Sequence, residues 1–428
     1  MKDRSRVKSP SSTRSTTSAA WPGSRSGADA RPAAPRAAAG RSPLGIVFLT
    51  VFLDLVGFGI VIPLLPLYAQ RFGAGAVAVA WLLAVYSLMQ FLFAPAWGRL
   101  SDRIGRRPVL LVGLFGSAAS YLACGVAGSL PLLFAARALN GVAGANIGVA
   151  QAYIADVTRP EDRAKGMGMI GAAFGLGFIV GPALGGLLLR WGPAAPFLFA
   201  AALTLANAVL AVFRLPESLP PERRAARPPA PTLAERARAL FGRATPGRLR
   251  ALYLAGFLFT LAIASAEGTF SLWADARWNA TGERVAYLFV FLGVVSAVAH
   301  AGVAGRLVRR IGERRTALAG LGSVAAGLVT AALAPSWPVL LVGLGLLALG
   351  QGLASPAVSS LISRQGGAAE QGRVLGIFQS LSALARAAGP VAGGVALAHV
   401  GLAAPFLSAS IVTAAAALVL VAIVGVFS

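Results

Sequence analysis

The chain has 428 residues, of which 57% are hydrophobic and 12% are charged, with a formal net charge of +23. Soluble domains carry about 25% charged residues, so this composition excludes an ordinary soluble protein. The single cysteine, Cys124, excludes an intrachain disulfide, and with only two histidines no cluster of residues has metal-ligand spacing.

Residues 1–43 are rich in Ser, Arg, Pro and Ala and contain no apolar core, so we expect a disordered basic tail rather than a secretory signal. Apolar segments of roughly 20 residues follow, long enough to cross a hydrocarbon core. Only helices satisfy their own backbone groups there. Transmembrane helices are therefore predicted at 44–69, 77–97, 109–128, 131–154, 166–189, 194–214, 251–273, 284–304, 316–334, 338–361, 373–398 and 402–426.

A polar, basic stretch at 215–250 divides these segments into two groups of six. The expected domains are the disordered tail, an N-terminal half at 44–214, a cytoplasmic linker at 215–250 and a C-terminal half at 251–428. Within the linker, Thr232 is predicted to cap a short amphipathic helix that ends near Leu240 and lies on the membrane surface.

The basic residues gather on one side of the predicted bundle. With both termini in the cytoplasm, 32 of the 38 Lys and Arg fall in the tail and the inner loops, and four fall in the outer loops. This bias follows the positive-inside rule and complements the anionic lipid of the cytoplasmic leaflet. We therefore expect a multi-pass protein of a cell (inner) membrane, and the net charge requires no nucleic-acid partner. We also expect the protein to be a monomer.

The two halves repeat each other. "GRLSDRIGRRPVLLVG" at 98–113 matches "GRLVRRIGERRTALAG" at 305–320, an offset of 207 residues, and 165–186 matches 373–394. Because each copy holds six helices, both enter the membrane in the same sense. The pattern predicts parallel repeats related by an axis along the membrane normal, with a central pathway between them.

The first copy of this turn is a candidate gating loop. Gly98 and Gly105 allow a tight reversal, and Pro108 suits the first turn of a helix. Asp102 can receive arginine partners or face a helix N-terminus. A contact of that kind between the halves would latch one conformation, whereas the alternative is a basic hairpin with an incidental acid. The candidate residues are Gly98, Asp102, Arg103, Gly105, Arg106, Arg107 and Pro108.

A charge deep inside a predicted transmembrane helix is costly and marks a functional candidate. An isolated carboxylate is desolvated there and would bind a proton readily, so Asp54, Glu267 and Arg137 are candidates for proton coupling. The alternatives for Asp54 are a structural pair with Arg137 or a hydrogen bond to helix ends, and the alternative for Arg137 is structural snorkelling. Arg386 either has a structural partner or binds substrate.

Small and polar residues complete the candidate site. Gly177, Gly181 and Gly185 recur every four residues, which permits close helix packing, and Pro182 kinks the helix that also carries Gly186. Packing alone is the alternative interpretation. The candidate substrate cavity is formed by Gln90, Asn140, Asn146, Gln151, Phe289, Gln351, Gln379 and Arg386.

"GRLSDRIGRRP" resembles the signature loop of the major facilitator superfamily. Residues 132–156 resemble that family's fourth-helix motif, with Arg137 and Gly141 in the matching places, and "GLGFIVGPALGG" at 175–186 resembles the fifth-helix motif of proton-coupled antiporters. Residues 52–72 and 86–103 look like the tetracycline and multidrug efflux branch. The resemblance implies an all-α membrane protein with twelve helices in two parallel six-helix repeats.

The resemblance also implies a proton-coupled antiporter that exports drugs or small lipophilic solutes, with the proton gradient as energy source and without cofactor, metal or enzymatic activity. Tetracycline antiporters carry further acids in the third and ninth helices. Here Ser120 stands at the first position and 316–334 holds no acid, which weakens tetracycline as the substrate. The alternatives are a proton symporter or facilitator that imports a metabolite, and a non-transporting receptor or scaffold.

Overall fold

A computed structural model describes residues 43–158, 163–224, 246–365 and 371–425. Within these ranges the chain is entirely helical, and it has 12 helices long and apolar enough to cross a membrane. The predicted all-α fold with twelve spans is thus confirmed. Residues 1–42 of the predicted tail and the predicted surface helix from Thr232 to Leu240 lie outside the described residues.

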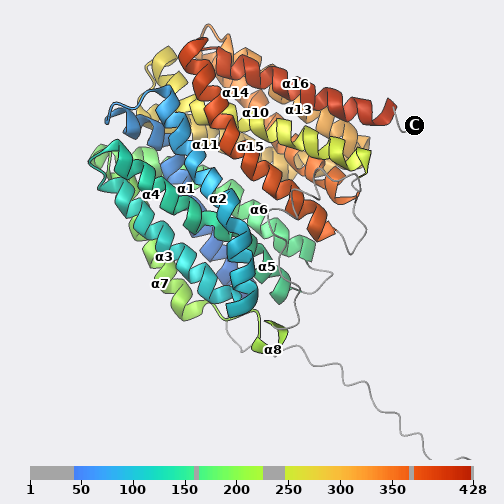
Figure 1. Cartoon of the computed structure of the whole chain (residues 1–428). Helices are drawn as coiled ribbons and strands as arrows, with labels where there is room; N and C mark the ends of the chain where they lie inside the picture. The colour runs from blue at the N-terminus through green and yellow to red at the C-terminus, as the bar shows by residue number, and fades with distance from the viewer. Residues whose placement is uncertain (1–42, 159–162, 225–245, 366–370, 426–428) are drawn as a thin grey trace, which may run out of the picture. The chain divides into compact units, whose positions relative to one another are not determined.

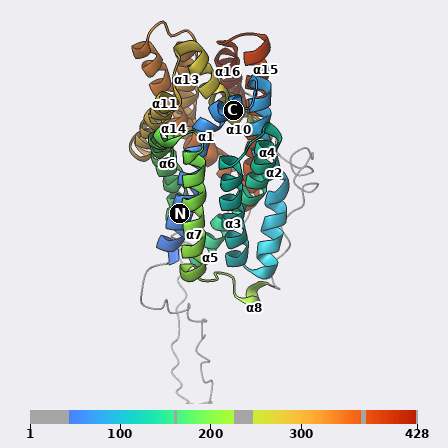
Figure 2. The same ribbon diagram turned by 90° about the vertical axis from the view of Figure 1, so that its left-hand side faces the viewer.

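The first six spans form the N-terminal half (Figure 1). The short helix α8 lies at the end of the bundle where α2 ends (Figure 2). The elements are α1 (Pro43–Gln70), α2 (Ala76–Ile104), α3 (Arg106–Gly125), α4 (Leu130–Ala143), η1 (Gly144–Asn146), α5 (Ile147–Val157), α6 (Arg163–Leu188), η3 (Leu189–Trp191), α7 (Ala195–Arg214) and α8 (Pro221–Arg224).

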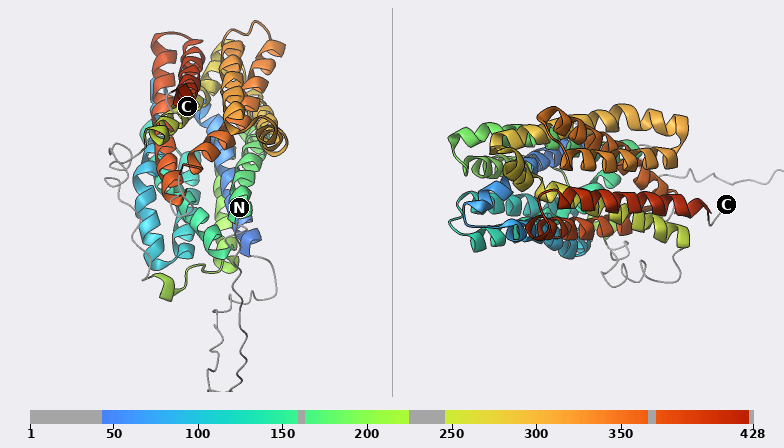
Figure 3. Two further views of the ribbon diagram at one scale, coloured as in Figure 1. Left: turned by 90° about the vertical axis from the view of Figure 1, so that its right-hand side faces the viewer. Right: turned by 90° about the horizontal axis from the view of Figure 1, so that it is seen from above.

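The last six spans form the C-terminal half, coloured yellow to red in Figure 3. The eighth span is continuous in space but contains a π-helical stretch, η4. The elements are α10 (Gly247–Trp278), α11 (Gly282–Val298), η4 (Ala299–Ala304), α12 (Gly305–Ile311), α13 (Glu313–Ala332), α14 (Trp337–Ser363), α15 (Gln371–His399) and α16 (Ala404–Gly425).

Each half has its own apolar core. In the N-terminal half Tyr68 packs on Phe197 with ring centroids 4.6 Å apart, and in the C-terminal half Trp273 packs on Phe406 at the same distance. These aromatic pairs join α1 to α7 and α10 to α16. Helices that are far apart in sequence are thereby joined within each half.

The seam between the halves is formed by α2 against α15 and by α6 against α11 (Figure 1). We call the end of the bundle with the turn at 98–108 the hairpin end, and the end with the loop at 71–75 the opposite end. At the seam Ser271 Oγ donates to the Pro63 carbonyl at 2.8 Å. Gly394 lies against Ala80.

Two further glycines lie at the seam where α6 packs against α11. A β-carbon on Gly186 would lie 2.8 Å from that of Ala286, and one on Gly293 would lie 2.9 Å from the Phe178 carbonyl oxygen. All of these described contacts lie between the middle of the helices and the opposite end. The halves are therefore closely joined on that side of the bundle.

Candidate functional site

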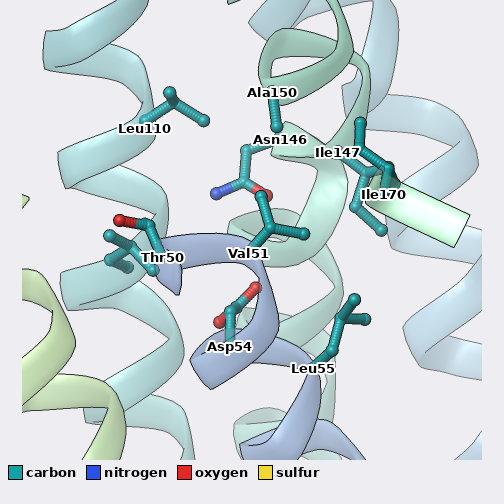
Figure 4. Close-up of a pocket in the computed structure, with 10 residues that line it drawn as sticks. Thr50, Val51, Asp54, Leu55, Leu110, Asn146, Ile147, Ala150 and Ile170 are labelled. Carbon is teal, nitrogen blue, oxygen red and sulfur yellow. The ribbon is translucent and has the colours of Figure 1, made fainter. Parts of the chain in front are cut away.

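Asp54 lies on α1 and lines a pocket inside the N-terminal half (Figure 4). Its Oδ1 is buried and has no hydrogen-bond partner, and the same holds for Oγ1 of Thr50, one helical turn earlier. Asn146 lines the same pocket from the opposite wall. The predicted candidate Asp54 is thus a carboxylate without a counter-charge in the described chain. The pocket is lined by Thr50, Val51, Asp54, Leu55, Leu110, Leu114, Asn146, Ile147, Ala150 and Ile170.

Arg137 on α4 is 1% exposed and has partners of two kinds. Its Nη1 donates to Asn140 Oδ1 at 2.8 Å, and its guanidinium lies 4.6 Å from the centre of the Tyr86 ring. Asn140 in turn donates to Ser120 Oγ at 2.8 Å. Arg137 therefore does not pair with Asp54, and the structural pair considered from the sequence is absent among these described residues.

The fourth span is broken at η1, where the α-helix changes to a 3-10 turn. Side chains of α2 satisfy carbonyls at this break: Gln90 Nε2 donates to the Gly144 carbonyl at 3.0 Å and Trp97 Nε1 to the Val142 carbonyl at 2.6 Å. Mid-helix 3-10 segments often mark hinges. Gln90 and Asn140 are therefore engaged in internal hydrogen bonds, although both were expected to line the cavity.

Glu267 and Arg386 lie on neighbouring helices of the C-terminal half. The Glu267 side chain is exposed and Arg386 is half-buried, although both lie deep among the helices, so they face a solvent-accessible interior. Gln351 Nε2 on α14 donates to Glu267 Oε1 at 3.3 Å. Gln379 is exposed on α15, seven residues before Arg386 and so on the same face.

Tyr86 is the residue that links these groups, and the sequence analysis missed it. It lies within electrostatic range of Asp54 and Arg137 in the N-terminal half and of Arg386 in the C-terminal half. Its side chain therefore lies where the two halves meet. Phe58 packs on its ring at 5.1 Å. A tyrosine in an apolar helix has no distinguishing spacing, and only the packing of α2 against α4 and α15 identifies it.

Two expected cavity residues, Phe289 and Asn146, lie elsewhere, and the place of Gln151 in the cavity stays a prediction. Phe289 is 6% exposed and packs edge-on against Phe270 in the C-terminal core, so it does not line the cavity. Asn146 is 5% exposed and belongs to the Asp54 pocket. Gln151 is half-buried on α5 and makes no described hydrogen bond to a charged group. Aromatic and amide residues are ambiguous in sequence because helix packing uses them as well.

The turn between α2 and α3 is held by a network within the N-terminal half. Arg106 Nη2 lies 2.6 Å from Asp102 Oδ1, and its Nε lies 3.3 Å from Asp156 Oδ2. Its Nη1 donates to Ser101 Oγ. Asp102 thus contacts Arg106 of its own half in this structure, and its contact across the halves stays a prediction.

Glu217, which follows α7, occupies the place expected for Asp102 at a helix N-terminus. Its carboxylate accepts hydrogen bonds from the backbone N–H of Arg106 at 2.8 Å and of Arg107 at 3.2 Å, the first residues of α3. Gly105 has φ +107°, and a β-carbon there would lie 2.3 Å from Glu217. Glycine is thus required both by the turn and by the capping carboxylate. Gly98 and Arg103 lie at the end of α2, and Pro108 lies in the first turn of α3.

The second turn repeats this arrangement with reversed charge. Gly312 has φ +83° at the position of Gly105, and Glu313 stands where the first copy has Arg106. Glu313 Oε1 lies 2.8 Å from Arg364 Nη2, at the end of α14. Arg364, like Asp156, lies at the end of the fourth span of its half, so each turn is tied to that span by an ion pair of opposite polarity.

The glycine ridge of α6 packs on α1. A β-carbon on Gly181 would lie 2.6 Å from the Gly59 carbonyl carbon, and one on Gly177 would lie 2.9 Å from the Leu55 β-carbon. Gly185 approaches the Ile60 carbonyl at 3.1 Å in the same way. Gly186 instead faces α11 across the seam, and Pro182 lies within α6. The ridge therefore places α6 directly against the helix that carries Asp54.

The family model described as Major Facilitator Superfamily matches residues 47–310 and 252–426. The chain belongs to this superfamily. It is 37% identical over 358 residues to the tetracycline resistance protein, class C, of Escherichia coli, covering 81% of this chain and 87% of that protein. It is 30% identical over 381 residues to multidrug resistance protein 2 of Bacillus subtilis (strain 168), covering 86% and 91%.

Among solved structures, the human organic anion transporter MFSD10 (TETRAN) superposes with a TM-score of 0.70 at 28% identity, covering 88% of this chain and 98% of that one. This major facilitator protein is accordingly a multi-pass secondary transporter of a small molecule and not an enzyme. It is related to the tetracycline and multidrug resistance proteins.

Proposed function

We propose that the protein is a proton-coupled antiporter that exports drugs or small lipophilic solutes by alternating access. Asp54 exchanges the coupled proton, Glu267 takes part in the exchange, and Arg137 positions Tyr86 between them. The resistance proteins to which the chain is related support the drug-export class. The antiporter-type glycine ridge of α6 supports the direction of exchange.

The observation that carries this proposal is the buried, unpartnered Oδ1 of Asp54. Burying a carboxylate without a partner is costly, and taking up a proton removes that cost. If the cost differs between the two conformations of the transporter, protonation shifts the equilibrium between them. The side chain is thus suited to exchange a proton once per cycle.

The orientation follows from the charges. We propose that the hairpin end and both termini face the cytoplasm of a cell membrane, where the basic turns contact anionic lipid. The described seam contacts lie toward the opposite end, so this conformation would receive substrate from the cytoplasm. The turns around Asp102 and Glu313 then govern closure of the hairpin end.

The test uses inverted membrane vesicles with an imposed proton gradient and a panel of cationic, zwitterionic and neutral drugs. The wild type is expected to accumulate at least one drug against its gradient. Asp54→Asn keeps the size and hydrogen-bonding groups but cannot exchange a proton, so uphill accumulation is expected to fall to the level of vesicles without the transporter, while downhill exchange persists.

Asp275→Asn is the matched control, because Asp275 lies near the end of α10 and away from the pocket, and it should retain uphill transport. Uphill transport by Asp54→Asn at the wild-type rate would refute the role of Asp54. Accumulation in the same direction as the proton flow would instead identify a symporter.

A further inference from the structure

Glu267 and Arg386 are two opposite charges that face the same interior without neutralising each other. They lie within electrostatic range, but they form no ion pair in the part of the chain that the structure describes. Arg386 makes no described hydrogen bond, and Glu267 receives one, from the uncharged Gln351. Both charges are therefore available to bind a ligand that enters from the solvent.

The two charges have a defined relative position. Their helices pack closely, since a β-carbon on Gly268 would lie 2.9 Å from Pro390 and one on Gly389 would lie 2.8 Å from the Leu261 carbonyl oxygen. Gly268 follows Glu267, and Pro390 lies one turn after Arg386. Both contacts place Arg386 nearer the hairpin end than Glu267, by at least about one helical turn.

The remaining intramembrane charges, Arg137 and Asp54, lie in separate surroundings in the N-terminal half. Arg137 is 1% exposed and is enclosed by Tyr86 and Asn140. Asp54 lies in its own pocket between α1, α3, α5 and α6. The charges that a substrate meets in the interior therefore come from the C-terminal half, and they are one carboxylate and one guanidinium.

A ligand with a single charge satisfies only one of these groups and brings its own charge near the like-charged other. Desolvating a charge without a partner is costly, and like-charge contacts discriminate strongly between ligands. A ligand with separated positive and negative groups satisfies both at once. The exposed amide of Gln379, on the same face of α15 as Arg386, offers an additional donor beside the anion.

We propose that the substrate is a zwitterion, with its cationic group bound by Glu267 and its anionic group bound by Arg386 toward the hairpin end. This rests on the proposed export function and narrows its substrate class. It also gives Glu267 a second role: beside its part in the proton exchange with Asp54, Glu267 recognises the substrate's charge together with Arg386. Tyr86, within range of Asp54 and Arg386, connects the two events.

The test measures equilibrium binding to the purified full-length protein in lipid nanodiscs, without a proton gradient, at neutral pH. One matched set of probes is norfloxacin as the zwitterion, its ethyl ester as the cation and its N-acetyl derivative as the anion. The second set is 2-naphthylalanine, its amide and its N-acetyl derivative. In at least one set the zwitterion is expected to bind at least tenfold more tightly than both single-charge forms.

The variants assign each end of the ligand. Glu267→Gln should remove the preference for the zwitterion over the anion, and Arg386→Gln should remove its preference over the cation. Glu283→Gln and Arg71→Gln change the same residue types at the opposite end of the bundle, where Glu283 accepts a hydrogen bond from Tyr287, and should leave both preferences unchanged.

Equal or tighter binding of a single-charge form in both sets, or no binding of either zwitterion, would overturn the proposal. A preference that persists in both cavity variants would overturn the assigned residues as well. These outcomes are independent of the vesicle assay, because antiport can persist with a cationic or neutral drug when zwitterion binding fails.

Discussion

Arg137 illustrates how a single charged side chain is accommodated inside the bundle. The guanidinium donates to Asn140 and lies over the Tyr86 ring, so it is stabilised by a hydrogen bond and by a cation–π contact. A planar guanidinium does both at once, whereas an ammonium is a compact, strongly hydrated charge. The identity of the residue therefore matters as much as its charge.

Replacing Arg137 by lysine tests this dual role. A desolvated cation–π contact contributes about 2 kcal/mol, so Arg137→Lys is expected to lower drug transport at least tenfold while the protein still folds. The measurement is initial transport rate in vesicles, normalised to protein amount. Arg277 lies over Trp278 at 5.2 Å but is exposed, so Arg277→Lys should transport normally. Equal rates for both variants would contradict the role of Arg137.

Residue partners are the level at which the sequence predicts least. Asp54, Arg137, Glu267 and Arg386 were identified because a charge within an apolar segment is conspicuous. Their partners were not, since Tyr86 has no distinguishing pattern. Glu217 accepts a hydrogen bond from the backbone N–H of Arg106, which is 111 residues away in the sequence. Such contacts depend on how helices from distant parts of the chain are packed.

Among the helices, α6 and α1 form a close glycine-mediated contact near the candidate site. The spacing of four residues between Gly177 and Gly181 predicted a ridge, and the structure places that ridge on α1. The spacing alone did not identify the partner helix. It also did not predict the break at η1, because the side chains that satisfy its carbonyls, Gln90 and Trp97, come from another helix, α2.

The contact gives a prediction for helix packing. Gly181→Ala places a methyl group 2.6 Å from the backbone of Gly59 and should destabilise the protein by about 1–3 kcal/mol. It is measured as a fall in melting temperature in detergent. Gly175 lies on the same helix with nothing within 4 Å, so Gly175→Ala should be neutral or slightly stabilising. Equal melting temperatures for the two variants would show that the ridge does not control this packing.

At the scale of the whole molecule, the two halves repeat the same backbone at their equivalent turns but carry different charges there. Gly105 and Gly312 both adopt positive φ at equivalent turns. The ion pairs beside them have opposite polarity and different environments. Arg106 is 4% exposed, whereas the Arg364 side chain is 71% exposed. The copied backbone is thus retained while each half has its own electrostatics.

This asymmetry predicts unequal effects of equivalent substitutions. Arg106→Gln removes the buried guanidinium that contacts both Asp102 and Asp156 and should cost about 3–5 kcal/mol. Arg364→Gln removes an exposed partner of Glu313 and should cost at most about 1 kcal/mol. Melting temperatures and yields of folded protein measure both. A loss at Arg364 as large as that at Arg106 would mean that the second turn is as enclosed as the first.

The glycine contacts at the opposite end have a consequence for what drives the two ends of the molecule. Alanine methyl groups and backbone atoms are in contact there, and Ser271 donates a hydrogen bond to the Pro63 carbonyl. Separating these groups therefore mainly exposes apolar surface to water. Wetting of that kind has a large heat capacity and depends steeply on temperature, whereas dissolved ions screen the charged turns at the hairpin end. Warming and ionic strength therefore act on different ends of one transporter, and the balance between its conformations responds to each separately.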